Sequence, residues 1–129
     1  MENEELKRLY VVLARCTGKI RACFGESYYA YGEIYADIAF GVLVGVIEDE
    51  KTRHAVLDMA LEDNMKKGEA MCSALNRREL MEKVVAASLK CGPAAAVFAL
   101  FGVGENAQTA DKIEGIAAEL TEYVSKCGD

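Results

Sequence analysis

Hydrophobic residues recur along this chain three or four positions apart, and short glycine-marked joints separate the runs. The first run, over residues 4–23, alternates spacings of three and four in the manner of a heptad seam: Leu6, Leu9, Leu13, Cys16, Ile20 and Cys23. A second such seam lies near the C-terminus: Ile113, Ile116, Leu120, Tyr123, Val124 and Cys127. This spacing places each set on one face of an amphipathic helix. The chain therefore begins and ends with a predicted helix.

Residues 27–47 predict the central helix of the fold, because its second half is apolar on every side, as in a helix surrounded by neighbours. Gly41 and Gly45 interrupt this half at a GxxxG spacing. Each glycine costs a helix up to about 1 kcal/mol relative to alanine. We expect close packing against another helix to offset that cost, and that helix can belong to this chain or to a partner.

The remaining pattern also favours helices. Residues 49–67 start with acids and end in "KKG", and Gly68 either ends this helix or lies within a periodicity that continues to Leu75. Asn76 and Glu79 form a capping box that predicts the next helix start, and "KCGP" predicts its end. A short apolar helix follows over 93–101. We expect one all-α domain over residues 1–129, a compact bundle of five to seven helices with no β-sheet.

Composition narrows the possible settings of this bundle. The longest apolar runs, 38–47 and 94–101, fall well short of the roughly 20 residues that a spanning helix needs, so we expect no membrane insertion. The start "MENEELKRLY" lacks the pattern of a secretory signal. Five cysteines without CxxC spacing and a single histidine argue against zinc and favour reduced thiols. We expect a cytoplasmic protein.

The charge pattern argues against nucleic-acid binding, because the net charge is -6. Basic residues nevertheless gather on the first helix, where Arg8, Arg15 and Lys19 share one stripe beside the leucine seam. They can receive an anionic partner or phosphates, or they can pair with the acidic C-terminal helix.

Four carboxylates suggest a metal site as an alternative. Glu33 and Asp37 lie one helical turn apart, as do Asp58 and Glu62. If the two helices form an antiparallel hairpin that turns near Asp49, the pairs meet and can hold Mg²⁺ or Mn²⁺, which prefer oxygen ligands. Otherwise they are ordinary solvated acids beside buried faces.

The segment "E-I-Y-A-D-I-A-F", residues 33–40, leads into an apolar helix and resembles the all-α nucleotide pyrophosphohydrolases of the MazG type. The resemblance covers about residues 32–67. It implies that acidic residues on bundle helices hold magnesium against a triphosphate. The family's upstream acidic pair has no counterpart here, where the preceding helix carries Arg15, Thr17, Gly18 and Lys19.

For function we expect a non-catalytic interaction protein without a cofactor, either a homo-oligomer or a small subunit of a larger assembly, whose partner is a second copy or another protein. Its candidate interface residues are large apolar or close-packing ones: Leu6, Leu9, Leu13, Gly41, Gly45, Phe98 and Phe101. His54 lies one turn from Asp58, but no nucleophile can be placed beside it. The alternatives are the Mg²⁺- or Mn²⁺-dependent hydrolase and a binder of an apolar ligand near four tyrosines, Tyr28, Tyr29, Tyr31 and Tyr35.

Overall fold

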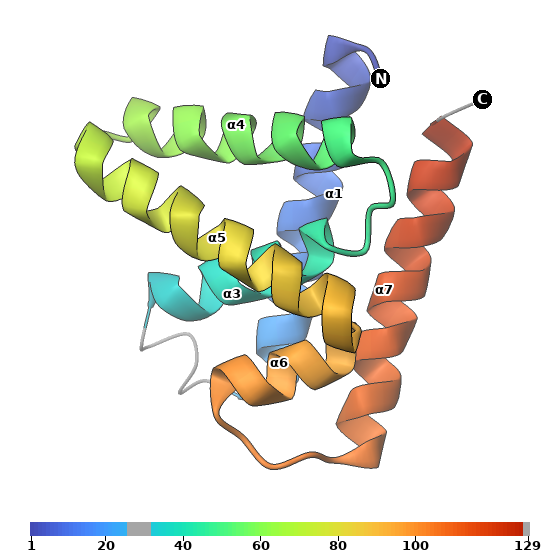
Figure 1. The fold of residues 1–129 in the computed structure, drawn as a ribbon. Coiled ribbons are helices and arrows are strands. Elements are labelled where there is room, and N and C mark those ends of the chain that lie inside the picture. Colours follow the sequence, from blue (N-terminus) through green and yellow to red (C-terminus); the bar gives the residue numbers. More distant parts are fainter. Residues whose placement is uncertain (26–31, 128–129) are drawn as a thin grey trace.

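Six α-helices make up the computed structural model, which describes residues 1–25 and 32–127 (Figure 1). In chain order they are α1 (Asn3–Ala22), α3 (Glu33–Val44), α4 (Glu50–Lys66), α5 (Met71–Cys91), α6 (Pro93–Phe101) and α7 (Ala107–Cys127). These described residues contain no strand, so the predicted all-α bundle is confirmed. Within them, no helix combines the length and apolar character that crossing a membrane requires.

Helix α3 lies at the centre, as the sequence predicts. It packs chiefly against α5 and α1, with α6 across its lower side, while α4 packs chiefly on α5 (Figure 1). Every residue of α3 from Asp37 to Val44 is buried. The helix ends at Val44 rather than at residue 47, because Gly45 caps it and the chain turns away.

The GxxxG glycines pack against α5 of the same chain, which answers the question of partner helix. A Cβ atom added to Gly41 would lie 2.8 Å from Val84 Cγ1, and one added to Gly45 would lie 2.7 Å from Ser88 Cβ. The two backbones therefore approach more closely than any side chain at these positions would allow. The Ser88 hydroxyl donates a hydrogen bond of 2.8 Å to the Val42 carbonyl oxygen across this contact.

The two heptad-like seams face each other within the chain. Helices α1 and α7 lie antiparallel and side by side, and both termini are at the same end of the molecule (Figure 1). Leu9, Leu13 and Ile20 of α1 and Ile113 and Leu120 of α7 are fully buried. The seams thus close the bundle rather than forming an exposed coiled-coil surface.

The structure decides one helix boundary that the sequence left open, and it contradicts one predicted helix start. Gly68 ends α4, because its φ of 94° suits glycine and breaks the helical path. Helix α5 already begins at Met71, so the capping box at Asn76 lies inside a helix and the predicted start there is wrong. By contrast Asp49 caps α4 as its sequence indicates, accepting a hydrogen bond from the Thr52 amide at 3.1 Å.

Replacing Gly41 by alanine tests the helix contact. Because the new methyl group would meet Val84 and the Met81 carbonyl oxygen, we expect Gly41→Ala to lower the free energy of unfolding by about 1–3 kcal/mol, the usual cost of overpacking. Urea denaturation measures the change.

The matched control is Gly115→Ala on α7, where an added Cβ meets nothing within 4 Å. Here the better helix propensity of alanine should raise the unfolding free energy by about 0.5–1 kcal/mol. Equal effects of the two substitutions would contradict the close approach of α3 and α5.

Candidate functional site

Asp37, the central member of the predicted carboxylate set, is bound by an arginine. Its side chain is 6% exposed, and Arg77 on α5 donates to both of its oxygens, from Nε at 2.9 Å and from Nη2 at 2.8 Å. The third arm of Arg77 reaches Glu69 Oε2 at 2.8 Å and lies 3.6 Å from Glu33 Oε2. The Asp37 carboxylate is thus neutralised from within the fold.

The four predicted metal ligands do not converge. The expected hairpin of α3 on α4 is wrong, because each of these helices packs chiefly against α5. Asp58 instead forms an ion pair with Arg78, which also binds Glu82 at 3.1 Å, and Glu62 is exposed. Within residues 1–25 and 32–127, no group of three or more His, Cys, Asp or Glu side chains is placed to hold a metal ion.

A small cavity of about 190 Å³ opens beside the Asp37–Arg77 pair, where α1, α3, α4 and α5 meet. The Tyr10 hydroxyl donates to Asp63 Oδ2 at 3.3 Å, and Lys67 Nζ lies 3.0 Å from the same oxygen. Burial, followed by the charge of Asp63, raises the pKa of Tyr10 to about 12. These polar groups bind one another and thereby tie the helices together.

This cavity differs from the tyrosine-lined site expected for an apolar ligand, because charged side chains line it. Tyr28, Tyr29 and Tyr31 fall outside the described residues. Tyr35 is part of an aromatic cluster, with its ring 5.0 Å from that of Phe101. His54 is exposed and lies 3.7 Å from Glu50, not beside Asp58 as a proton-accepting pair.

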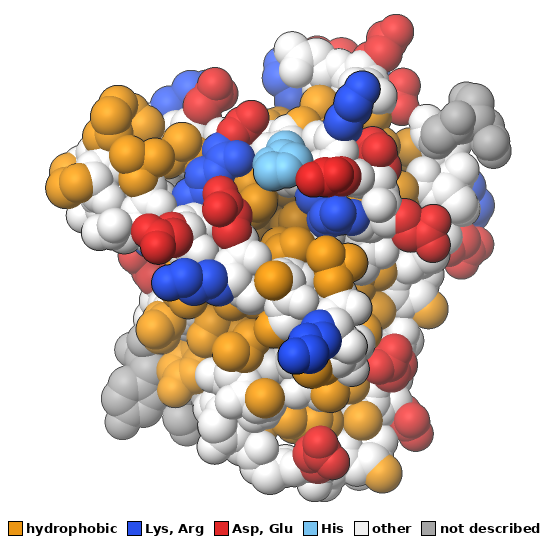
Figure 2. Space-filling view, viewed as in Figure 1, with side chains coloured by type: hydrophobic (Ala, Val, Ile, Leu, Met, Phe, Trp, Pro, Cys, Tyr) orange, Lys and Arg blue, Asp and Glu red, His pale blue; other side chains and the backbone are white. Residues whose placement is uncertain are grey.

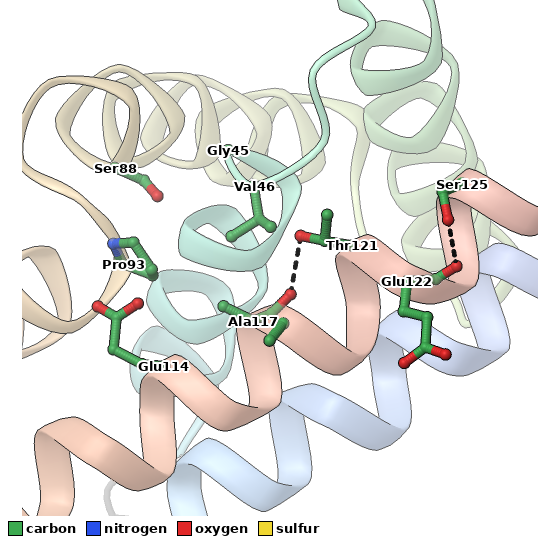
Figure 3. A pocket seen from close by; sticks show the side chains of 10 residues that line it. Gly45, Val46, Ser88, Pro93, Glu114, Ala117, Thr121, Glu122 and Ser125 are labelled. Carbon is green, nitrogen blue, oxygen red and sulfur yellow. Dashed lines mark hydrogen bonds between the residues drawn. The ribbon is translucent and has the colours of Figure 1, made fainter.

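A groove of about 540 Å³ lies between α7 and the adjoining ends of α3, α5 and α6 (Figure 3). Val46 and Gly45 lie on its α3 side, Ser88 and Pro93 come from α5 and α6, and the other side is α7. The α7 residues that line it are mostly small: Glu114, Ala117, Ala118, Thr121, Glu122 and Ser125. A second cavity, of about 260 Å³, continues the groove and shares Val46, Thr121 and Ser125 with it. We call this continuous hollow the α7 groove.

Four carboxylates and no lysine or arginine line the α7 groove: Glu48, Asp49, Glu114 and Glu122. Glu48 and Glu114 form no salt bridge with any residue that the structure describes. Glu122 pairs with Lys126, one turn away, at 3.2 Å, and both side chains are exposed. The groove therefore carries a negative potential that favours cationic groups.

The hydroxyl groups of the α7 groove are engaged with backbone carbonyls. Thr121 donates to Ala117 at 3.0 Å and Ser125 donates to Glu122 at 2.8 Å, as the dashed lines in Figure 3 mark, while Ser88 donates to Val42. None of the described hydrogen bonds of these hydroxyls goes to a carboxylate or to a histidine, the groups that would activate a nucleophile.

The predicted interface residues lie inside the fold. Leu9, Leu13, Gly41, Gly45, Phe98 and Phe101 are buried and Leu6 is half-buried, so they are not available as an outer surface and that prediction is corrected. Residues that are large or helix-breaking form the core here. The groove residues were missed because they are small. The signal that would have found them is the run of small side chains three and four positions apart on α7.

Of the three basic candidates, Lys19 binds within the chain and two face outward. Lys19 Nζ lies 3.2 Å from Glu119 Oε1, which is the pairing with the acidic C-terminal helix that the sequence offered as one reading. Arg8 and Arg15 are exposed and form no salt bridge to a described residue. They flank Val11, which is 54% exposed.

Exposed apolar side chains also gather at the end of the molecule where α4 joins α5 (Figure 2). Met65, Met71 and Leu75 form this tip. The α7 groove combines a hollow with four carboxylates and no lining lysine or arginine, and this combination makes it the candidate site.

Comparison with known proteins adds no relative to this picture. No family model, curated protein or solved structure matches the chain. The resemblance to nucleotide pyrophosphohydrolases rests on the segment 33–40 and its neighbours, and two of the four carboxylates, Asp37 and Asp58, are bound by different arginines.

Two adjacent arginines allow a matched test of the buried ion pair. We expect Arg77→Met to lower the free energy of unfolding by about 3–5 kcal/mol, because it leaves the buried Asp37 carboxylate without its partner. Arg78→Met removes an arginine whose acidic partners are exposed, so its cost should be within about 1 kcal/mol. Similar losses in both variants, measured by urea denaturation at pH 7, would contradict the structural role of Asp37.

The same variant has a predictable pH dependence. Burial raises the pKa of the Asp37 carboxyl above its ordinary value, and the Arg77 guanidinium opposes that rise. Removing the guanidinium should raise this pKa further, so the folded state binds a proton more tightly than the unfolded chain does. Stability lost in Arg77→Met should therefore be partly regained as the pH falls through the raised pKa toward the ordinary one. Adding Asp37→Asn to Arg77→Met should abolish this regain, and its persistence would assign it to another group.

Proposed function

We propose that this protein is a non-catalytic interaction protein whose α7 groove binds a basic helical segment of a protein partner. The observation that carries the proposal is the pairing of an open, small-residue groove with four carboxylates and no lining lysine or arginine. A partner helix with an apolar face would fit the small-residue groove, and basic residues beside that face would pair with the carboxylates. The cytoplasmic location expected from the sequence remains part of this proposal.

The shape of the α7 groove supports a helix as the bound segment. The α7 residues that line it run from Glu114 to Ser125, which is about 16 Å of helix at 1.5 Å per residue. Small residues let a second helix approach closely, so that its side chains fit between Ala117, Ala118 and Thr121. A segment of three helical turns would span this length.

The charge of the groove supports a basic partner over other ligands. Phosphate groups of a nucleic acid or nucleotide would meet carboxylates and no compensating cation on the groove walls. A lysine or arginine beside Glu114 would instead provide the ion pair that this carboxylate lacks among the described residues. Such rim pairs contribute modestly to affinity and more to orientation and partner choice.

A synthetic probe helix tests the proposal. The probe is a fluorescent peptide of about 20 residues with an alanine and leucine seam flanked by lysines, long enough to form a helix on binding, and its counterpart has glutamates in place of the lysines. We expect the basic probe to bind saturably in fluorescence anisotropy, more weakly as salt increases, and the acidic probe not to bind.

Removing two groove carboxylates gives the matching variant. The double variant Glu114→Gln with Glu122→Gln should bind the basic probe roughly tenfold more weakly, since two ion pairs at the groove rim contribute about 1.4 kcal/mol together to the binding free energy. The control is Glu62→Gln with Glu79→Gln, which makes the same change in net charge at exposed acids outside the groove. Equal binding by both variants, or no binding by the wild type, would overturn the proposed function.

A further inference from the structure

Resting on this proposed function, we propose that the basic helix that enters the α7 groove is the outer face of α1 in a second copy of the same chain. The contact is head-to-tail: each copy offers its α1 face to one neighbour and its α7 groove to another. Three features of the structure support this contact: the exposed face of α1, the spacing of charges on both helices, and the packing that connects them.

The outer face of α1, opposite its leucine seam, carries the basic side chains that the acidic groove lacks. Val11 is 54% exposed there, next to the exposed Ala14 and one turn from Arg8 and Arg15 on either side along the helix. Neither arginine has a salt-bridge partner among the described residues. A half-exposed valine between two arginines that form no described salt bridge makes an apolar ridge with basic ends.

The charges on the two helices match in spacing. Arg8 and Arg15 are seven residues apart, about 10 Å along α1, and Glu114 and Glu122 are eight residues apart, about 12 Å along α7. Between the arginines lies Val11, and between the glutamates lie Ala118 and Thr121. Two ion pairs can therefore form at the ends while the valine packs between small side chains.

The groove carboxylates are available to form ion pairs with the arginines of a neighbouring copy. Glu114 has no described salt-bridge partner, and the Glu122–Lys126 pair is solvent-exposed on both sides. An exposed pair of this kind contributes at most about 1 kcal/mol, so Arg8 or Arg15 of a neighbour can replace Lys126 at little cost. Both partners therefore gain contacts without breaking a buried one.

One chain holds the two surfaces in fixed relation. The buried seams of α1 and α7 pack together, and Lys19 binds Glu119 across them. Because the α1 face and the α7 groove are different surfaces of this rigid pair, the contact is heterologous, and repetition closes a ring or extends a chain. Lys19 is already paired, so it is not part of the proposed contact.

Charge reversal and complementation test the inference. The first variant carries Arg8→Glu and Arg15→Glu, and the second carries Glu114→Lys and Glu122→Lys. By sedimentation velocity at low salt, we expect the wild type to exceed the mass of one chain as its concentration rises, and each variant alone to bind itself at least tenfold more weakly. An equimolar mixture should associate again, because each contact in the mixed pair joins opposite charges.

The control variant reverses two exposed lysines of α5, Lys83→Glu with Lys90→Glu, and changes net charge as much as the first variant does. It should associate like the wild type. A wild type that stays one chain in mass, a first variant that associates like the wild type, or a mixture that fails to associate would overturn the inference.

The probe helix separates the two proposals. The first variant keeps its groove intact and should bind the basic probe as the wild type does. If self-association is absent while the probe still binds, the partner is a different protein and only the inference falls. If the wild type does not bind the probe, the proposed function falls, and the inference that rests on it falls as well.

Discussion

The close approach of α3 to α5 is the constraint on which the rest of the structure depends. Gly41 and Gly45 bring the two backbones together, and this contact sets Ser88 against the Val42 carbonyl at one end and Arg77 against Asp37 at the other. The buried aspartate is acceptable only because Arg77 is held there in bidentate geometry. The close packing of α3 on α5 therefore depends on the Asp37–Arg77 ion pair, and the ion pair depends on that packing. Helices α1 and α6 cover the remaining sides of α3.

The α7 groove follows from how the chain leaves this core. Helix α3 ends at Val44 and is capped by Gly45. The connection to α4 is fixed by the Asp49 cap and by Arg53, which donates to the Ile47 carbonyl oxygen at 2.6 Å and to the Glu48 carbonyl oxygen at 2.8 Å. Helix α7 is drawn to α1 and α6 by its apolar seam. No described element fills the space between the α3–α4 connection and α7. The acidic side chains of the connection and of α7 therefore line an open hollow.

The helical class could be predicted because apolar periodicity and glycine joints are local properties of the sequence. The GxxxG motif likewise indicated a close helix contact before its partner was known. The metal hypothesis failed because it assumed that the consecutive helices α3 and α4 pack as a hairpin. Instead, α5 packs on both of them, with Arg77 binding Asp37 of α3 and Arg78 binding Asp58 of α4. The groove could not be predicted from large apolar residues. Ala118, Thr121 and Ser125 help to form it because their side chains are small and leave an open space beside α7.

The distribution of charge, rather than its total, decides what such a surface can bind. A net charge of -6 makes two copies repel each other at long range. At 0.1 M ionic strength that repulsion is screened beyond about 10 Å, while ion pairs in direct contact are screened much less. A segregated pattern, with Arg8 and Arg15 on one helix and Glu114 and Glu122 on another, can therefore produce local attraction between molecules of like net charge. The same segregation gives the contact a direction, because neither surface is complementary to itself.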